Sequence, residues 1–116
     1  MWYFVKGEFV EENIAGKPFE EIATWIEMVI HPSLEMLEKW IQDKKAVGGI
    51  IAGERTGIFL LDAPSNEEVG KMLRSLPFWG ALKWTVSPLQ SPRSAAEQDK
   101  WAFEQARAMM GKAGKM

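Results

Sequence analysis

The segment VGGIIAGERTGIFLLDA, residues 47–63, decides the fold of this chain. Two runs rich in aliphatic residues, Val47–Ala52 and Gly57–Ala63, flank the turn sequence GERTG, and this pattern predicts two strands joined as a hairpin. A sheet with one wet face should alternate apolar and polar residues, but both runs are apolar at consecutive positions. A sheet built on this hairpin therefore needs a cover on each of its faces.

The segments before the hairpin predict a strand and a long helical region. Met1–Val10 alternates aromatic and β-branched residues, which is typical of a strand. A helical stripe follows from Pro18, and Pro32 is expected to kink this helix or to start a second one, because proline lacks the N–H and clashes with the preceding turn. We expect Gly48 and Gly49 to stop the helix.

The segments after the hairpin predict a second helix, a fourth strand and a last helix. Ser65 and Glu68 form a capping box that starts the second helix, and Pro77 ends it. Leu82–Leu89 reads as a strand, and residues 95–110 read as an amphipathic helix. The order β-α-β-β-α-β predicts a ferredoxin-like α+β domain over residues 1–92, with both main helices on one face of an antiparallel sheet, and a C-terminal helical extension over residues 93–116.

The second face of this predicted sheet has no cover within the chain, because too few residues remain to supply one. The simplest cover is the same face of a second copy, related by a two-fold axis. We therefore expect a homodimer or a higher homo-oligomer in which two sheets form a dimeric α/β barrel. The C-terminal helix carries an apolar stripe too short to fold alone, so we expect it to pack on its own subunit or on a neighbour.

Composition excludes several classes of partner and chemistry. The net charge of the 116 residues is −2, and Lys and Arg are scattered among acids, so nucleic-acid binding is not expected. The absence of cysteine excludes disulfides, thiolate metal sites and a cysteine nucleophile. No apolar run approaches the length of a membrane span, and we expect a cytoplasmic protein without a membrane partner. Six tryptophans indicate packing surfaces beyond the monomer or an aromatic pocket.

The segment FLLDAPSNEEVGKMLRSLPFWGALKWTVSPLQS, residues 59–91, resembles the muconolactone isomerase-like family of dimeric α/β barrels. The opening WYFVKGEFV is also similar, so that the resemblance covers residues 1–10 and 47–92. The shared features are an acid that ends the third strand, a serine that opens the second helix, a Leu-Pro pair with two aromatic residues, and a Pro-Leu pair that ends the fourth strand: Asp62, Ser65, Leu76, Pro77, Phe78, Trp79, Pro88 and Leu89.

The resemblance implies a ligand cleft beside the barrel-side face of the sheet and an isomerase that moves a proton without a metal or an organic cofactor. The expected substrate is a small hydrophobic or cyclic acid. Lys6 and Glu8 match positions of the family, and they share one face of the first strand. There they would act as proton donor and acceptor, the alternative being a structural or subunit-bridging ion pair. The chain departs from the family at Phe4, where a histidine is expected, and at Lys83 and Thr85, where acids are expected.

His31 is the single histidine and a candidate proton shuttle, because its ordinary pKa lies near neutrality; the alternative is a capping or surface role. Glu27, His31 and Glu35 follow the spacing of one helix face, but Pro32 disturbs that geometry, and no metal site is expected.

The remaining candidates shape a pocket. Trp2, Phe4, Phe78 and Trp79 are expected to line it, the alternative for Phe78 and Trp79 being a place in the core. Lys83 and Thr85 are expected to hold an anionic group, or else are solvated edge residues. Two further functions stay open: a non-catalytic oligomeric module that binds a small apolar ligand or only scaffolds, and a cofactor-free monooxygenase of the same fold.

Overall fold

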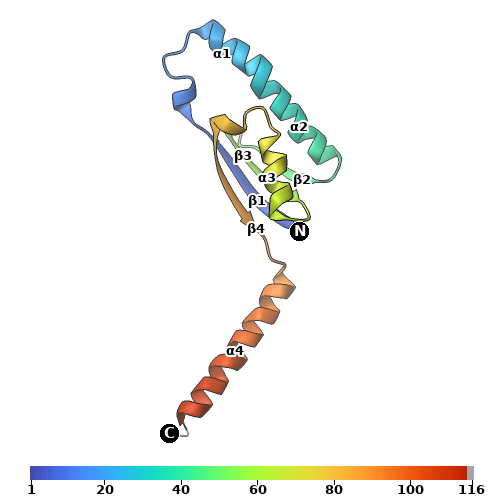
Figure 1. Cartoon of the computed structure of the whole chain (residues 1–116), viewed down its shortest axis with the longest axis vertical. Coiled ribbons are helices and arrows are strands. Elements are labelled where there is room, and N and C mark those ends of the chain that lie inside the picture. The colour runs from blue at the N-terminus through green and yellow to red at the C-terminus, as the bar shows by residue number, and fades with distance from the viewer. Residues whose placement is uncertain (115–116) are drawn as a thin grey trace.

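The computed structural model describes residues 1–114, and four strands form one antiparallel sheet in the order β2-β3-β1-β4 (Figure 1). The strands are β1 (Trp2–Phe9), β2 (Ala46–Ile50), β3 (Thr56–Asp62) and β4 (Leu82–Pro88). This order results when two helical crossovers flank one hairpin, so the predicted ferredoxin-like α+β fold is confirmed. The predicted strand ends differ from the observed ends by at most two residues.

The helices of the body, which we define as residues 1–91, lie on one face of the sheet (Figure 1). One long helical region contains α1 (Phe19–Trp25), a π-helical segment η2 (Ile26–Ile30) and α2 (His31–Gln42). The second crossover is α3 (Asn66–Arg74), and the short 3-10 turns are η1 (Glu11–Asn13) and η3 (Trp79–Ala81). The Ser65 hydroxyl caps α3 by accepting the Glu68 N–H at 3.2 Å, as the capping box predicts.

The core lies between the sheet and these helices. In β1, Tyr3 and Val5 are buried, whereas Phe4 and Lys6 are only partly covered, as the predicted alternation requires. The other buried apolar side chains come from β2, β3, the helices and the turn after α3: Leu37, Ala46, Phe59, Leu61, Ala63, Val69, Leu73, Leu76 and Phe78. No helix within residues 1–114 is both long and apolar enough to cross a membrane.

Pro32 lies in the first turn of α2, so that a second α-helical segment starts there, as one of the two expected outcomes requires, and a π turn precedes it. His31 donates its backbone N–H to the Ile26 carbonyl, five residues back. This wider turn accommodates the proline, which has no N–H and would clash with the carbonyl four residues before it. The next residue, Ser33, is fully buried, donates its hydroxyl to the Val29 carbonyl at 2.7 Å and accepts the Phe78 N–H at 3.0 Å. Ser33 thereby joins α2 to the turn after α3.

The prediction that Gly48 and Gly49 stop the helix is wrong. The helix ends at Gln42, and Lys44 adopts the left-handed conformation with φ 61°. The Lys45 N–H donates to the Trp40 carbonyl at 2.8 Å, which completes a helix-ending motif that usually carries glycine. Both glycines lie in β2 instead. Glycine is the residue usually found in the left-handed conformation, so a lysine in this conformation cannot be recognised from the sequence.

The C-terminal helix α4 (Pro92–Gly114) is longer than predicted and leaves the body (Figure 1). The radius of gyration is 21.0 Å, whereas a compact chain of this length has about 13 Å. The apolar side chains of Trp101, Phe103 and Met109 are more than 60% exposed. Packing of this helix on its own subunit is therefore wrong, and packing on a neighbour stays a prediction.

Gly48 is expected to be irreplaceable in β2. Its φ is 139°, and a Cβ atom there would lie 2.2 Å from the Ile58 carbonyl oxygen. Gly48→Ala should therefore lower the free energy of unfolding by about 1–3 kcal/mol, measured by urea denaturation. Gly49→Ala is the matched control, since no atom lies within 4 Å of its added Cβ. Equal stability of the two variants would contradict this account of the hairpin.

Candidate ligand cavity and the open face of the sheet

The structure places the predicted site residues on two opposite faces of the sheet. Trp2, Phe4, Lys6 and Glu8 alternate with buried residues of β1 and lie on the face without helices, which we call the open face. Thr85 pairs with Lys6 and Lys83 pairs with Glu8 across the β1–β4 ladder, so both share this face. Phe78 lies on the other side of the sheet, among the helices. The nine predicted residues therefore do not form one site in a single copy of the chain.

Lys6 and Glu8 form an ion pair, with 2.7 Å between Nζ and Oε1 and both side chains about 40% exposed. The hydrogen bond from Lys6, and then its charge, lower the pKa of Glu8, and Lys83 lowers it further. The same hydrogen bond, and then the negative charge of Glu8, raise the pKa of Lys6. Both groups are therefore ionised near neutral pH, which suits an ion pair better than a proton donor poised near the working pH.

Apolar side chains surround this ion pair on the open face. The strand register places Phe4 beside Leu60, and Leu60 beside Val47, so apolar residues continue across three strands. Val47 is 58% exposed, and Ile58 and Leu60 are each 37% exposed. Within residues 1–114 no element of the chain covers this surface. Contiguous exposed apolar patches often mark interaction sites.

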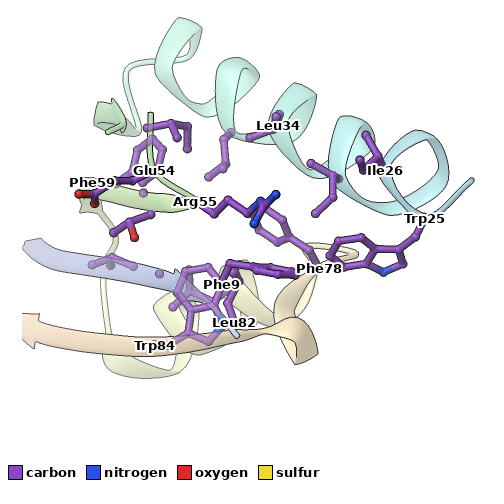
Figure 2. A pocket seen from close by; sticks show the side chains of 18 of the residues that line it. Phe9, Trp25, Ile26, Leu34, Glu54, Arg55, Phe59, Phe78, Leu82 and Trp84 are labelled. Carbon is purple, nitrogen blue, oxygen red and sulfur yellow. The ribbon is translucent and has the colours of Figure 1, made fainter. Parts of the chain in front are cut away.

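A cavity of about 270 Å³ lies on the opposite side, between the sheet and the α1–η2–α2 region (Figure 2). The helical region supplies one wall through Ile22, Trp25, Ile26, Ile30 and Leu34. The facing wall comes from the strands and from the turn after α3: Val5, Phe9, Phe59, Phe78, Leu82 and Trp84. An engineered protein cavity of about 150 Å³ holds benzene. The present cavity therefore has room for a molecule of one or two rings.

The charged residues that line this cavity sit together, in the turn between β2 and β3. They are Glu54 and Arg55. The Arg55 guanidinium lies 5.7 Å from the centre of the Phe9 ring and donates to both oxygens of Glu11, at 2.9 and 3.0 Å. Figure 2 shows the Arg55 side chain between the helical wall and Phe9. A ligand inside would meet apolar groups over most of its surface and a guanidinium at one end.

The turn after α3 forms a fixed wall of the cavity. The Phe78 ring meets the Trp84 ring edge-on at 6.2 Å, and the Phe78 N–H donates to Ser33. The Trp84 indole N–H donates to the Trp79 carbonyl at 2.9 Å. Asn13 donates its amide to the Ala81 carbonyl at 2.9 Å, which attaches the loop before α1 to the same turn. Within this turn Leu76 and Phe78 are buried in the core, and Phe78 also lines the cavity.

Two other predicted residues lie outside the cavity. His31 is exposed at the first position of α2, and Trp79 is 39% exposed with the Arg74 guanidinium 5.1 Å from its ring. Neither lines the cavity. Among the residues that the structure describes, no three His, Cys, Asp or Glu side chains gather as metal ligands, and Glu27, His31 and Glu35 are no exception.

Sequence reasoning missed Trp25, Arg55 and the isoleucines of the helical wall as cavity residues. Ile22, Ile26 and Ile30 follow helical spacing, and this spacing cannot distinguish a side chain that packs in the core from one that borders an empty volume. Arg55 lies in the predicted hairpin turn, where a charged residue is ordinary. Its position beside the cavity depends on how the helical region packs over the sheet, which the sequence does not specify.

Comparison with known proteins supports the fold. No family model and no curated protein sequence matches the chain. Among solved structures, the crystal structure of muconolactone isomerase superposes with a TM-score of 0.61 and 22% sequence identity. The match covers 79% of this chain and 92% of that protein. The chain therefore has the muconolactone isomerase-like fold that its sequence predicted.

Proposed function

We propose that this protein binds a compact, mainly apolar small molecule in the cavity between the sheet and the α1–η2–α2 region. The observation that carries the proposal is the cavity itself, about 270 Å³ in volume and enclosed by aromatic and aliphatic side chains. Small-molecule sites in proteins are concave and mainly apolar, with a few polar groups that fix the orientation of the ligand. The Arg55 guanidinium at the mouth has that role here.

The expected ligand is a small cyclic or aromatic acid. A guanidinium can bind a carboxylate through two parallel hydrogen bonds. Arg55 already contacts both oxygens of Glu11 through Nη1. A ligand carboxylate near Arg55 would take over, or share, the place of the Glu11 carboxylate. The ring of the ligand would then point into the apolar interior. A ring that carries a carboxylate agrees with the substrate class that the sequence predicts.

Isomerase activity is the second candidate, and the likeness to muconolactone isomerase favours it. The Lys6–Glu8 pair would carry the proton chemistry, and it lies on the face of the sheet opposite the cavity. Such chemistry therefore requires a second ligand space on the open face, between two copies of the chain. In that space Trp2 and Phe4 would contact the substrate, and Lys83 and Thr85 would hold its anionic group.

Pairing of two open faces is the third part of the proposal. The apolar band of β1, β2 and β3 gains stability when a second copy covers it, because burial of apolar surface is favourable at about 25 cal/mol per Å². A two-fold contact would place each band against its own equivalent. This arrangement is the dimeric α/β barrel that the sequence predicts.

A larger side chain inside the cavity should weaken the binding of small ligands. Benzoate and indole are suitable probes, and Ile30→Phe should weaken both by at least about tenfold, measured by titration calorimetry. Met28→Phe is the matched control, because Met28 lies in the same π-helical segment but is 67% exposed and outside this cavity. Arg55→Met should weaken benzoate more than indole. Unchanged binding to Ile30→Phe would contradict the assignment of the cavity.

Glu8→Gln should lower the melting temperature in a pH-dependent way. The lowered pKa of Glu8 means that the ion pair stabilises the fold above the ordinary Glu value of 4.5, and that this effect disappears as the pH falls below it. The raised pKa of Lys6 means that the effect also disappears as the pH rises beyond 10.5. Calorimetry should therefore show a difference from the unsubstituted protein near neutral pH and none in acid.

The control for this experiment is Glu12→Gln, in the exposed turn η1. A difference between the Glu8 variant and the unsubstituted protein that persists unchanged at pH values far below 4.5 would show that the ion pair is not its cause.

Charge on the open face should prevent pairing. Sedimentation should give the unsubstituted protein about twice the 13.1 kDa mass of one chain, and Leu60→Glu should give a single chain, because the pairing would bury an unpaired carboxylate. Ser87→Glu, on the same face at the edge strand β4, is a milder change and should only weaken the dimer. Glu35→Lys on the outside of α2 is the control. A Leu60→Glu protein that still sediments as a dimer would refute the pairing.

A further inference from the structure

The helix α4 carries an apolar stripe that nothing in the body contacts. Ala102, Ala106 and Met109 follow spacings of four and three residues, which place them on one helix face, beyond Asp99 on the same face. Trp101 lies on the opposite side of the helix. Phe103 and Met110 widen this stripe along its flank, and they are 64% and 73% exposed. Alanine at most central positions lets another surface approach the helix closely. A helix of this composition is marginal in water without a partner.

The direction of α4 is fixed at its start, next to the open face. The Leu89 N–H donates to the Trp2 carbonyl at 2.8 Å, which continues the β1–β4 ladder beyond β4. The Ser91 hydroxyl then caps α4 by accepting the Ser94 N–H at 3.0 Å. Trp2 is one of the exposed residues of the open face. A second copy seated on the open face would therefore lie close to the start of α4.

The open face alone is small for a stable dimer. Four strands of about seven residues cover about 19 by 23 Å, or about 400 Å². A stable interface buries about 800 Å² on each partner. Residues 102–110 of α4 span about 14 Å, and a stripe about 10 Å wide along them adds about 140 Å². The open face and the stripe together come close to the lower end of the range for stable interfaces, about 600 Å² on each partner.

The charges of α4 do not favour a membrane surface or a nucleic acid as the partner. The acidic and basic residues of this helix nearly cancel: Glu97, Asp99 and Glu104 against Arg93, Lys100, Arg107 and Lys112. Helices that lie on membranes carry a strongly basic polar face. The partner must therefore offer mainly apolar surface, and a second copy with its open face and its own α4 does so.

We propose that α4 is a dimerisation arm whose apolar stripe packs against the second copy of the chain. The proposal rests on the pairing of two open faces and adds the element that makes this pairing stable. It also explains why the helix beyond its first turn extends away from the body (Figure 1). In the dimer each arm would reach past its own sheet and lie along the other copy.

The test compares two alanines of the full-length chain. Ala106→Glu introduces a carboxylate into the stripe, and Ala108→Glu introduces the same group on the other side of the helix with the same loss of helix propensity. Ala106→Glu should raise the dimer dissociation constant by at least about tenfold, measured by sedimentation equilibrium, and Ala108→Glu should leave it unchanged. Equal helix content of the two variants by circular dichroism ensures that the comparison concerns packing.

A second measurement uses the absence of cysteine from the chain. A nitroxide on Ala106→Cys should lose mobility as the protein dimerises, and one on Ala108→Cys should stay mobile. Equal dissociation constants for the two glutamate variants, or equal mobility of the two labels at every concentration, would overturn the arm. If Leu60→Glu leaves the dimer intact while Ala106→Glu separates it, the pairing of open faces fails and the arm stands. If only Leu60→Glu separates it, the arm fails and the pairing stands.

Discussion

A four-stranded antiparallel sheet with apolar side chains on both faces is the constraint on which the rest of this structure depends, although the open face is apolar only in a band across β1, β2 and β3. In an isolated domain one face of such a sheet would be polar and solvated. Here α1, α2 and α3 cover one face, and the other keeps Val47, Ile58 and Leu60 substantially exposed. The two faces therefore have different roles. One encloses a cavity within a single chain, and the other offers an apolar surface to a second molecule.

The cavity exists because the helical layer is held away from the sheet at one end. The π turn before Pro32 lets the helix run on over the hairpin, and Ser33 anchors that helix to the turn that carries Phe78. Ser33 is fully buried, with its hydroxyl both donating and accepting, so the anchor has a defined geometry. A small apolar molecule would fill the volume that these contacts keep open.

The sequence allowed the order of elements, the sheet topology and the buried face of β1 to be predicted, because these follow from the period of apolar residues and from caps such as Ser65. It did not reveal the end of the long helix, where Lys44 adopts a conformation usual for glycine. The sequence also suggested one site for Lys6 and Phe78, although the two residues lie on opposite faces of the sheet. Residue types indicated a pocket, but which side of the sheet holds an empty volume depends on packing distances that no spacing encodes.

The central claim is that the open face belongs to an interface between two copies. An isotope-filtered nuclear Overhauser experiment on a mixture of labelled and unlabelled protein tests it most directly, since it detects only contacts between different molecules. The account predicts cross-peaks between the Leu60 methyl groups of one copy and the aromatic rings of Trp2 or Phe4 of the other. Absence of every such cross-peak, in a sample concentrated enough for dimers to form, would contradict it.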